Sequence, residues 1–499
     1  MMRSITTDYL VVGAGAMGMA FTDSLIDHAD VDVTLVDRRH VAGGHWQDAY
    51  PFVQLHQASL FYGVASTVLG NGALQQTGPE TGLQERSSQP AIQAYYDDVL
   101  HRRLLASGRV TFMGGNEYTT DGSSHLVTSP ASGETVRVEV RRRVVDATYL
   151  APAIPATTAP PFGVADGASV IPINDLATMA ATNKHFVIVG SGKTATDGVV
   201  WLLKNGVQQD QIVWVRPRDP WMSNRAVVQP NPVVALGFAA DIMESAAIAD
   251  SADELFLRLE DGGAMLRLDP SVVPTMAKVP TLAVWELELL RTIQNVVRLG
   301  HIRHVTRSEI VLQHGSVSLA PNSLIVHCAA SGLTNPPVVD IWGADKMRLQ
   351  TSRHGFPCFN AALIGYVEAT RDDDRERNRL LPPNFFSNTP RDWALMNALG
   401  VLATRKFGAE ADIAAWANAC ALNPARIQPA QRGDPKVQAA IARLAGVAEH
   451  GLQRLTQLAS EPASQRFSIR DATGGVGPSC RSRWGRRQDR QRSALSIPD

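Results

Sequence analysis

Six residues near the N-terminus have the types and the spacing of a loop that binds a dinucleotide. Residues 13–18 read Gly-Ala-Gly-Ala-Met-Gly, which is the pattern G-x-G-x-x-G. A short apolar run at 9–12 precedes this loop, helical spacing follows at 16–28, and Asp37 ends the next apolar run. A lone glycine pattern is weak, but a strand, a glycine turn, a helix and a later acidic residue together predict a nucleotide site.

Each predicted contact of this first loop has its own physical task. Gly13 permits a sharp turn, Gly15 lets the backbone approach a pyrophosphate, and Gly18 lets the helix pack close to the strand. The helix N-terminus then presents N–H groups and a positive dipole end to the phosphates. Asp37 can accept hydrogen bonds from ribose hydroxyls, and the adjacent Arg38 is predicted to contact the same nucleotide. The alternative is a glycine turn that holds no ligand.

The same order of strand, glycine turn and helix recurs at 186–205, as a weak internal repeat of a βαβ unit. Residues 190–195 read Gly-Ser-Gly-Lys-Thr-Ala, the accepted variant G-x-G-x-x-A. Part of this motif is similar to the end of an ATP-binding phosphate loop, but Val187 stands where that loop needs its first glycine. The predicted contacts with a second dinucleotide are Gly190, Gly192 and Thr194.

Two arginines after the second strand of this repeat indicate which nicotinamide dinucleotide it takes. Arg216 ends the strand, where an acidic residue would favour NAD, and Arg218 follows two residues later. Arginine presents a fork of donors to a phosphate, so the pair favours the 2′-phosphate of NADPH. The alternative is that both are solvated surface arginines.

The residues between the two repeats carry a resemblance to a known group. Gly43-Gly44-His45-Trp46 is followed by Tyr50-Pro51. With the two glycine motifs in this order, the sequence resembles the two-dinucleotide-binding flavoproteins, and especially the flavin-containing monooxygenase-like group, over about residues 8–385. The resemblance implies that FAD binds at the first loop and that NADPH binds in a second, inserted domain. The FAD contacts implied in this stretch are Gly44, His45 and Trp46.

Later segments are similar to the parts that join the two domains in that group. Ala147-Thr148-Tyr149 looks like its A-T-G segment, with Tyr149 in place of glycine, and implies that Ala147 and Thr148 contact FAD. The small residues at 327–332 look like the return to the FAD domain. Residues 359–366 are expected to run along the flavin end, or with equal weight to form a core helix.

The resemblance also points to the stretch after the Tyr-Pro pair, from which a polar residue faces the flavin in these monooxygenases. His56 is the predicted catalytic residue, as a hydrogen-bond donor or as an acid and base, and Tyr62 is the second candidate. One departure weighs against oxygenation. The group carries F-x-G-x-x-x-H-x-x-x-aromatic before its second glycine motif, and the matching span at 162–176 has no histidine.

These elements predict an α/β protein with two Rossmann-like, doubly wound domains. The resemblance implies that the NAD(P)-binding domain is inserted in the FAD-binding domain. A helical C-terminal extension follows. The predicted parts are 1–160 and 326–390 for the FAD-binding domain, 161–325 for the NADP-binding domain, 391–460 for the helical extension and 461–499 for a disordered, arginine-rich tail.

The composition argues against several other classes of function. Of the 499 residues, 44% are apolar and 19% charged, which is typical of a folded globular protein. A net charge of −1 does not indicate binding to nucleic acid or to a membrane surface. The four cysteines are scattered without a C-x-x-C, so we expect no metal, no redox dithiol and a reducing, cytoplasmic location. No apolar run approaches the ~20 residues of a membrane helix, and the N-terminus lacks the pattern of a signal peptide.

The combined prediction is an FAD- and NADPH-dependent oxidoreductase, foremost a flavin monooxygenase that uses O₂ on a small organic substrate. Two alternatives stay open. One is a flavin reductase or dehydrogenase that passes electrons to a quinone or a protein. The other is a dinucleotide sensor without turnover.

Overall fold

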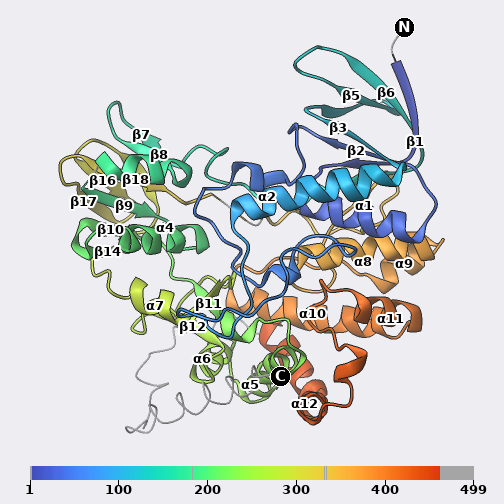
Figure 1. Ribbon diagram of the computed structural model, residues 1–499. Helices are drawn as coiled ribbons and strands as arrows, with labels where there is room; N and C mark the ends of the chain where they lie inside the picture. The colour runs from blue at the N-terminus through green and yellow to red at the C-terminus, as the bar shows by residue number, and fades with distance from the viewer. Residues whose placement is uncertain (1–2, 183, 331, 333, 461–499) are drawn as a thin grey trace.

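Two sheets with parallel cores form the framework of the protein, the first at the upper right of Figure 1 and the second at its left. The computed structural model describes residues 3–182, 184–330, 332 and 334–460. The tail predicted at 461–499, with Cys480, lies outside the described residues.

The first sheet carries the first glycine loop. Its strands, in order across the sheet, are β3 (Val110–Gly114), β2 (Val33–Asp37), β1 (Arg3–Val12), β6 (Thr135–Asp146), β5 (Ser124–Thr128) and β4 (Glu117–Asp121). The first four of these run parallel, whereas β5 and β4 are antiparallel to their neighbours. β19 (Met347–Arg348) also pairs with β6 in parallel, so a late segment of the chain returns to this sheet. All residues of β2 are buried, as expected for an apolar strand that is covered on both faces.

The second sheet carries the second glycine loop and is parallel throughout. Its strands, in order, are β14 (Val296–Val297), β10 (Ile212–Val215), β9 (His185–Val189), β18 (Ser323–His327) and β8 (Val170–Pro172). Because all of them lie between β6 and β19 in the chain, this unit is inserted in the first, and the predicted fold class is confirmed. β18 pairs with β9 and β8, so we propose that the inserted unit extends to His327, slightly beyond the predicted boundary.

A smaller sheet covers one face of the inserted unit. It consists of β17 (Gly315–Ser318), β16 (Glu309–Leu312), β15 (Ile302–Val305) and β7 (Gly163–Val164). Val187 and Val189 of β9 share a buried apolar cluster with Val305 and Ile310 of this sheet. The inserted unit therefore has an apolar core of its own beside the second sheet.

Two helices lie side by side against the first sheet (Figure 1), α1 (Ala16–His28) and α8 (Pro357–Thr370). Gly365 permits this close packing, because a Cβ atom there would lie 2.6 Å from the carbonyl oxygen of Phe21. Residues 359–366 thus form a buried core helix, one of the two outcomes expected for them. Each helix follows a parallel strand of the same sheet, so both begin at its carboxyl edge.

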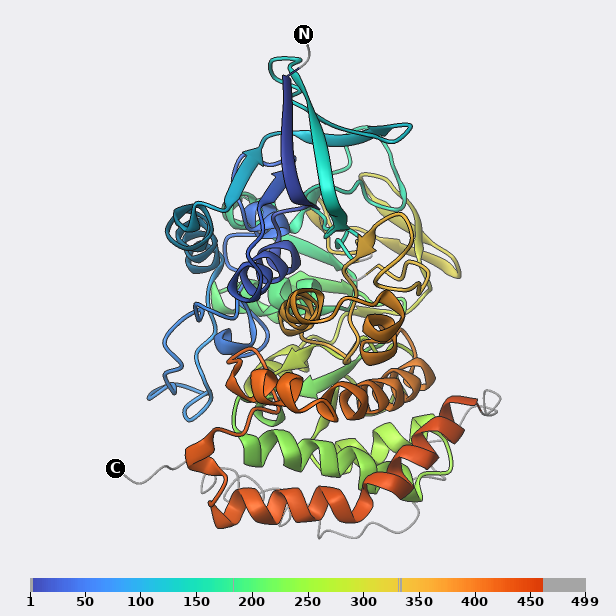
Figure 2. The same cartoon turned by 90° about the vertical axis from the view of Figure 1, so that its right-hand side faces the viewer.

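A layer of helices lies at the bottom of the molecule in Figure 2. The layer comprises α5 (Pro232–Ile248), α6 (Ala252–Asp261), α10 (Pro390–Gly408), α11 (Ala411–Ala419) and α12 (Pro435–Ser460). The predicted C-terminal helical extension is confirmed, but α5 and α6 come from the inserted unit and share an apolar cluster with α10 and α12. Sequence patterns could not reveal this, because helical periodicity marks an apolar face without naming its partner.

The remaining elements connect these layers. They are β12 (Met265–Arg267), β11 (Trp221–Asn224) and β13 (Thr281–Leu282), which form a small sheet, and α2 (Gln89–Asp98), α3 (Leu176–Met179), α4 (Lys193–Lys204), α7 (Val284–Leu290) and α9 (Asp374–Leu380). Among the described helices, none combines the length and the apolar character needed to cross a membrane.

Candidate functional site

The first glycine loop has the backbone shape that its sequence predicts. Gly13 has a φ of 107°, in the region that favours glycine, and its N–H donates to the carbonyl of Val36 at 2.7 Å. A Cβ atom at Gly18 would overlap the carbonyl oxygen of Gly13, so the helix can approach the strand only with glycine there. α1 begins after Gly15, and no side chain caps this end. The first N–H groups of the helix are therefore available to an anionic ligand.

Asp37 stands at the carboxyl end of β2 and holds the loop. Its Oδ2 accepts from the N–H of Ala14 at 2.7 Å, and its Oδ1 accepts from the N–H of Arg39 at 2.8 Å. A carboxylate has about four lone-pair directions, so these two bonds leave capacity for ribose hydroxyls. The side chain of Arg38 is exposed at the same edge.

Two further predicted segments pack directly on this loop. Gly44 has a φ of 58°, and a Cβ atom on it would lie 2.9 Å from the Cα of Gly15. A Cβ atom on Gly13 would lie 2.9 Å from the Cγ2 of Thr148. The fold therefore brings together Gly13, Gly15, Gly18, Gly44, Ala147 and Thr148.

Tyr149, which replaces the glycine of the A-T-G segment, turns to a different part of the chain. Its hydroxyl donates to the carbonyl of Pro337 at 2.5 Å. Thr148 is held by Asp146, which accepts both its N–H and its hydroxyl. The tyrosine thus leaves the contact of Thr148 with the glycine loop intact.

His45, Trp46 and Tyr62 form a small aromatic group after the loop. The Nε1 of Trp46 donates to the Tyr62 hydroxyl at 2.6 Å, and their rings meet edge to face at 5.8 Å. Burial, and then the charge of Arg39, lowers the pKa of His45 to about 4. Burial raises the pKa of Tyr62. At neutral pH His45 is therefore uncharged, and Tyr62 keeps a proton that it can donate.

The second glycine loop repeats this geometry and leaves space above it. Gly190 has a φ of 122°, and its carbonyl accepts from the Nε1 of Trp214 at 2.7 Å. α4 begins after Gly192 without a side-chain cap, and a Cβ atom on Gly192 would meet nothing within 4 Å. Thr194 is half-buried in the first turn of α4. Open space at the second glycine is what a dinucleotide pyrophosphate requires.

The two predicted phosphate arginines differ in their surroundings. Arg216 is 4% exposed, lies over the ring of Trp214 at 4.7 Å, and is 3.5 Å from Asp219. Its buried Nε has no hydrogen-bond partner among the described residues. Arg218 is half-buried and donates to the carbonyl of Thr275 at 2.7 Å. Arg216 is thus enclosed at the strand end, Arg218 lies nearer to the surface, and the contact of both with a 2′-phosphate stays a prediction.

Lys278 is a cation near this point that the sequence did not reveal. It is half-buried, and burial followed by the charge of Arg218 lowers its pKa. Two cations at the end of β10 produce a positive potential that suits a phosphate group. No motif surrounds Lys278, so its proximity to Arg218 could be found only from the fold.

His56 lies in a buried polar network between the first unit and the inserted one. Its Nδ1 accepts from the N–H of Thr281 at 3.2 Å, and its carbonyl accepts from the Nε of Arg225 at 3.0 Å. Arg225 is 2% exposed and pairs with Glu80 at 2.5 Å and with Glu286 at 2.7 Å. These three charged residues were missed, because no spacing in the sequence connects them.

The protonation state of His56 follows from these contacts. Burial, and then the charges of Lys193 and Arg225, lowers its pKa to about 3. Because Nδ1 is an acceptor, the proton of the neutral ring is assigned to Nε2. His56 can therefore donate a hydrogen bond near neutral pH, but it holds no second proton to give. Tyr62 belongs to a separate group with Trp46, so the two catalytic candidates occupy different clusters.

One hydrogen bond connects the neighbourhoods of the two glycine loops. The hydroxyl of Tyr50 donates to Asp197 of α4 at 2.7 Å, and Asp197 also pairs with Lys193. The ring of Phe52 stacks on Trp201 of the same helix, with centroids 5.0 Å apart. The segment after the first loop is thus fixed to the helix that begins at the second.

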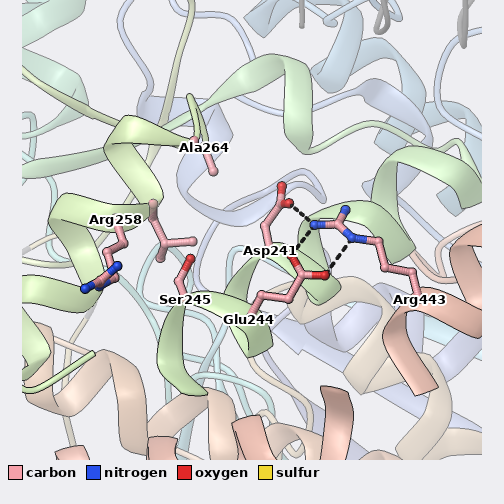
Figure 3. Close-up of a pocket in the computed structure, with 8 residues that line it drawn as sticks. Asp241, Glu244, Ser245, Arg258, Ala264 and Arg443 are labelled. Atoms are coloured by element: carbon pink, nitrogen blue, oxygen red, sulfur yellow. Dashed lines mark hydrogen bonds and ion pairs between the residues drawn. The ribbon is translucent and has the colours of Figure 1, made fainter. Parts of the chain in front are cut away.

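A cavity of about 250 Å³ lies elsewhere, between α5, α6 and α12 (Figure 3). Arg443 pairs in it with Asp241 at 2.8 Å and with Glu244 at 2.5 Å. The opposite charges at its wall neutralise one another, and none of the predicted site residues lines it. We assign it no role in the nucleotide sites.

The model of the NAD(P)-binding Rossmann-like domain family matches residues 11–65, which include the first glycine loop. Two solved structures are similar at low identity. Cyclohexanone monooxygenase from Rhodococcus sp. Phi1 bound to NADP+ is 15% identical, with 89% of this chain and 98% of that chain covered and a TM-score of 0.47. Oxidized steroid monooxygenase bound to NADP is 14% identical, with coverages of 90% and 99% and a TM-score of 0.48. Likenesses at this level carry no conclusion about the chain.

Two curated relatives are much more similar. Uncharacterized protein Rv2000 of Mycobacterium tuberculosis (strain ATCC 25618 / H37Rv) is 38% identical over 472 residues, which are 93% of this chain and 87% of the relative. Uncharacterized protein Mb2023 of Mycobacterium bovis (strain ATCC BAA-935 / AF2122/97) matches with the same values. Identity at this level along nearly the whole length establishes common membership, so the chain belongs to the protein family of these mycobacterial proteins.

Proposed function

We propose that the protein is an oxidoreductase that binds FAD at the first glycine loop and NADPH at the second. The observation that carries the proposal is the Tyr50–Asp197 hydrogen bond, which fixes the neighbourhoods of the two loops to each other. Two uncapped helix N-termini and the open space at Gly192 support the fit of two dinucleotides. Ligands of doubly wound sheets lie beyond the carboxyl ends of the strands, which is where both loops stand.

Bound FAD would supply the redox chemistry, by accepting a hydride from NADPH and reacting onward. The residues of the chain would bind and orient the cofactors. The N–H groups at the start of α1 would hold the FAD pyrophosphate, with Asp37 at the ribose. Arg218 and Lys278 would attract the 2′-phosphate of NADPH. His56 would act as a neutral hydrogen-bond donor through Nε2, and Tyr62 as a second donor.

We further propose that oxygen is the electron acceptor and that a small organic substrate is oxygenated. The uncharged state of His56 and the missing histidine at 162–176 leave a flavin reductase as the second candidate. In that case the chain would pass electrons to a quinone or a protein. A dinucleotide sensor would bind the cofactors without turnover.

The test is an absorbance spectrum of the purified protein without oxygen, before and after NADPH or NADH is added. We expect flavin bands that bleach with NADPH, and more slowly with NADH. Air should then restore the bands, and an oxygenated product should form in step with NADPH consumption. One hydrogen peroxide formed per NADPH consumed, with every substrate tried, would contradict the monooxygenase. Fast reoxidation of the reduced flavin by a quinone but not by oxygen would support the reductase. Flavin bands that neither nicotinamide bleaches would support the sensor.

The choice between NADPH and NADH tests the second loop separately. R218A and K278A should each raise the KM for NADPH by about tenfold, as expected for one lost charge-assisted contact of about 1.4 kcal/mol. The KM for NADH should change little. R303A removes an exposed cation from β15 and serves as the matched control. Equal effects on both nicotinamides would contradict a role at the 2′-phosphate.

A further inference from the structure

The connection between β19 and α8 holds an arginine without an acidic partner. Arg353 is half-buried, and its Nη1 donates to the side-chain oxygen of Asn423 at 2.9 Å. Burial alone lowers its pKa to about 10, with no carboxylate of the described chain opposing the shift. Arg225 and Arg377 are more deeply buried than Arg353, and each pairs with two carboxylates. A sheltered guanidinium without such a partner is costly, and a ligand with a negative charge would offset this cost.

The loop that carries Arg353 is organised by one buried amide. The side-chain oxygen of Asn360 accepts from the N–H groups of Ser352 and Arg353, at 2.8 and 2.9 Å. Its side-chain nitrogen donates to the carbonyls of Arg353, Gly355 and Phe356. Phe356 is held at a φ of 50°, a conformation that costs a non-glycine residue about 1–3 kcal/mol. The loop is thus a built structure, and backbone strain of this kind clusters at ligand sites.

Two more polar atoms in this loop lack partners. Ser352 is 1% exposed, and its hydroxyl oxygen has no hydrogen-bond partner among the described residues. The Nδ1 of His354 is likewise buried without a partner in the described chain. Burial and the charge of Arg353 lower the pKa of His354 to about 3, so it is uncharged. Buried polar atoms without partners are rare in folded proteins. The Nδ1 of His354 lies against Gly400 of α10, where a Cβ atom would come within 2.8 Å of it, so only the Ser352 hydroxyl is offered as a partner for a polar ligand.

The order of the strands indicates which part of FAD reaches this loop. Asp37 marks the adenosine side at β2, and the glycine loop at β1 marks the pyrophosphate. β6 and β19 follow on the opposite side of β1 from β2. Neighbouring strands lie about 4.8 Å apart, so the end of β19 is about 10 Å from β1, on the side away from the adenosine. The riboflavin half of the cofactor must extend in this direction.

We propose that Arg353 supplies the positive charge that balances the negative charge of the bound flavin ring when NADPH has reduced it. The inference rests on the proposed function. A hydride carries two electrons and one proton, so the neutral oxidised ring becomes an anion, and Arg353 gives up no proton. A cation beside the ring stabilises the reduced form over the oxidised form and raises the reduction potential.

The test compares the reduction potential of FAD bound to the full-length protein in wild type and in R353Q, R353K and R426Q. R426Q is the matched control, because Arg426 is likewise half-buried and donates to a neutral oxygen, the carbonyl of Asn418. We expect R353Q to weaken the preference for reduced over oxidised FAD by tenfold to a hundredfold, which lowers the two-electron potential by about 30–60 mV. R353K should keep most of the wild-type potential, and R426Q should match wild type.

Each outcome decides between the proposals. Wild-type protein that binds no FAD overturns the proposed function, and this inference with it. FAD that binds normally but keeps its potential in R353Q overturns this inference alone. Should R353Q fail to fold, sulfite binding to the wild type gives a second readout, because sulfite adds to the flavin ring and leaves a negative charge on it. Bleaching of the flavin band by sulfite supports the proposal, and resistance to sulfite at every concentration contradicts it.

Discussion

The hydroxyl of Tyr50 donates a 2.7 Å hydrogen bond to the carboxylate of Asp197. Tyr50 comes from the segment after the first glycine loop, and Asp197 lies one turn into the helix that begins at the second. Burial, and then the charge of Asp197, raises the pKa of Tyr50 well above its usual value, so the hydroxyl keeps its proton across the physiological range. This contact between two side chains that are far apart in the sequence is therefore one of those that fix the relative position of the two loops.

Removing this contact should separate cofactor binding from electron transfer. In Y50F the half-buried carboxylate of Asp197 loses one donor and keeps its pair with Lys193, so we expect a cost of about 0.5–1.5 kcal/mol of the free energy of unfolding. FAD should still bind, because the first loop is untouched, but its reduction by NADPH should slow. Stopped-flow absorbance under nitrogen measures the rate, and urea unfolding measures the stability.

Y118F is the matched control for that variant. Tyr118 also loses one hydrogen bond on substitution, to the Nδ1 of His125, but it lies on β4 at the far end of the first sheet. An equal slowing of flavin reduction in both variants would show that lost stability, and not the Tyr50–Asp197 contact, is responsible.

Two glycines that occupy different steric surroundings should respond differently to alanine. G18A places a methyl group on the carbonyl oxygen of Gly13, so we expect loss of FAD binding and a lower melting temperature. G192A places its methyl group in open space, so the fold and the FAD content should stay as in wild type. The KM for NADPH should nevertheless rise in G192A, because the methyl group occupies the predicted position of the pyrophosphate. Differential scanning fluorimetry measures the melting temperature of each variant, and FAD absorbance measures its cofactor content. A normal affinity of G192A for NADPH would contradict the proposal that NADPH binds at the second loop.

The buried ion pairs of Arg225 should dominate the stability of the contact between the units. R225M removes the shared cation from Glu286 and from Glu80, although Glu80 keeps its pair with Arg86. Breaking a buried ion pair typically costs about 3–5 kcal/mol, and we expect the lower end of this range. R443M breaks an exposed cluster with Glu244, for which we expect about 0–1 kcal/mol. Urea unfolding of both variants at one pH measures the difference. Equal losses in the two variants would contradict the role assigned to the buried network.

The buried histidines should make the protein sensitive to acid. His56 and His354 have a pKa of about 3, and His45 of about 4, below the ~6.5 of an unfolded chain. Between these values the unfolded chain binds protons that the folded protein does not, so the free energy of unfolding falls as the pH decreases from about 6.5 towards 4. Each histidine contributes up to about 1.4 kcal/mol per pH unit to this slope. Unfolding curves across this range should show a smaller slope in H56Q.

H101Q serves as the control in that experiment, because His101 is exposed on the surface. Its slope should equal that of wild type. If the free energy of unfolding of H56Q has the same pH slope as that of wild type and of H101Q, His56 titrates normally in the folded protein. His56 could then act as an acid and a base near neutral pH.

Several features of the site were predictable because they depend on neighbours in the sequence. The turn at Gly13, the close approach at Gly18 and the strand that ends at Asp37 are local geometry, and the residue types alone specify them. Gly190 and Gly192 could be found in the same way. The family resemblance implied that Ala147 and Thr148 contact FAD, and only the structure shows that both pack on the first loop.

Other features depend on pairs of residues that no local pattern connects. Arg225 meets Glu80 across 145 positions, and Lys278 approaches Arg218 from a different strand connection. Burial is also invisible in the sequence. Arg216 and Arg218 both follow the same strand, but only the structure shows that Arg216 is enclosed and that Arg218 lies nearer to the surface.

The sequence by itself determined the two units built on a glycine loop and the helical extension, because glycine spacing and apolar periodicity express local backbone requirements. The insertion of one unit in the other was implied by the family resemblance. Only the tertiary structure decided that α5 and α6 join the C-terminal helices, that His56 is neutral and that Arg353 lacks an acidic partner. Burial and charge pairing arise between segments that meet only after folding, so no single segment of the sequence predicts them.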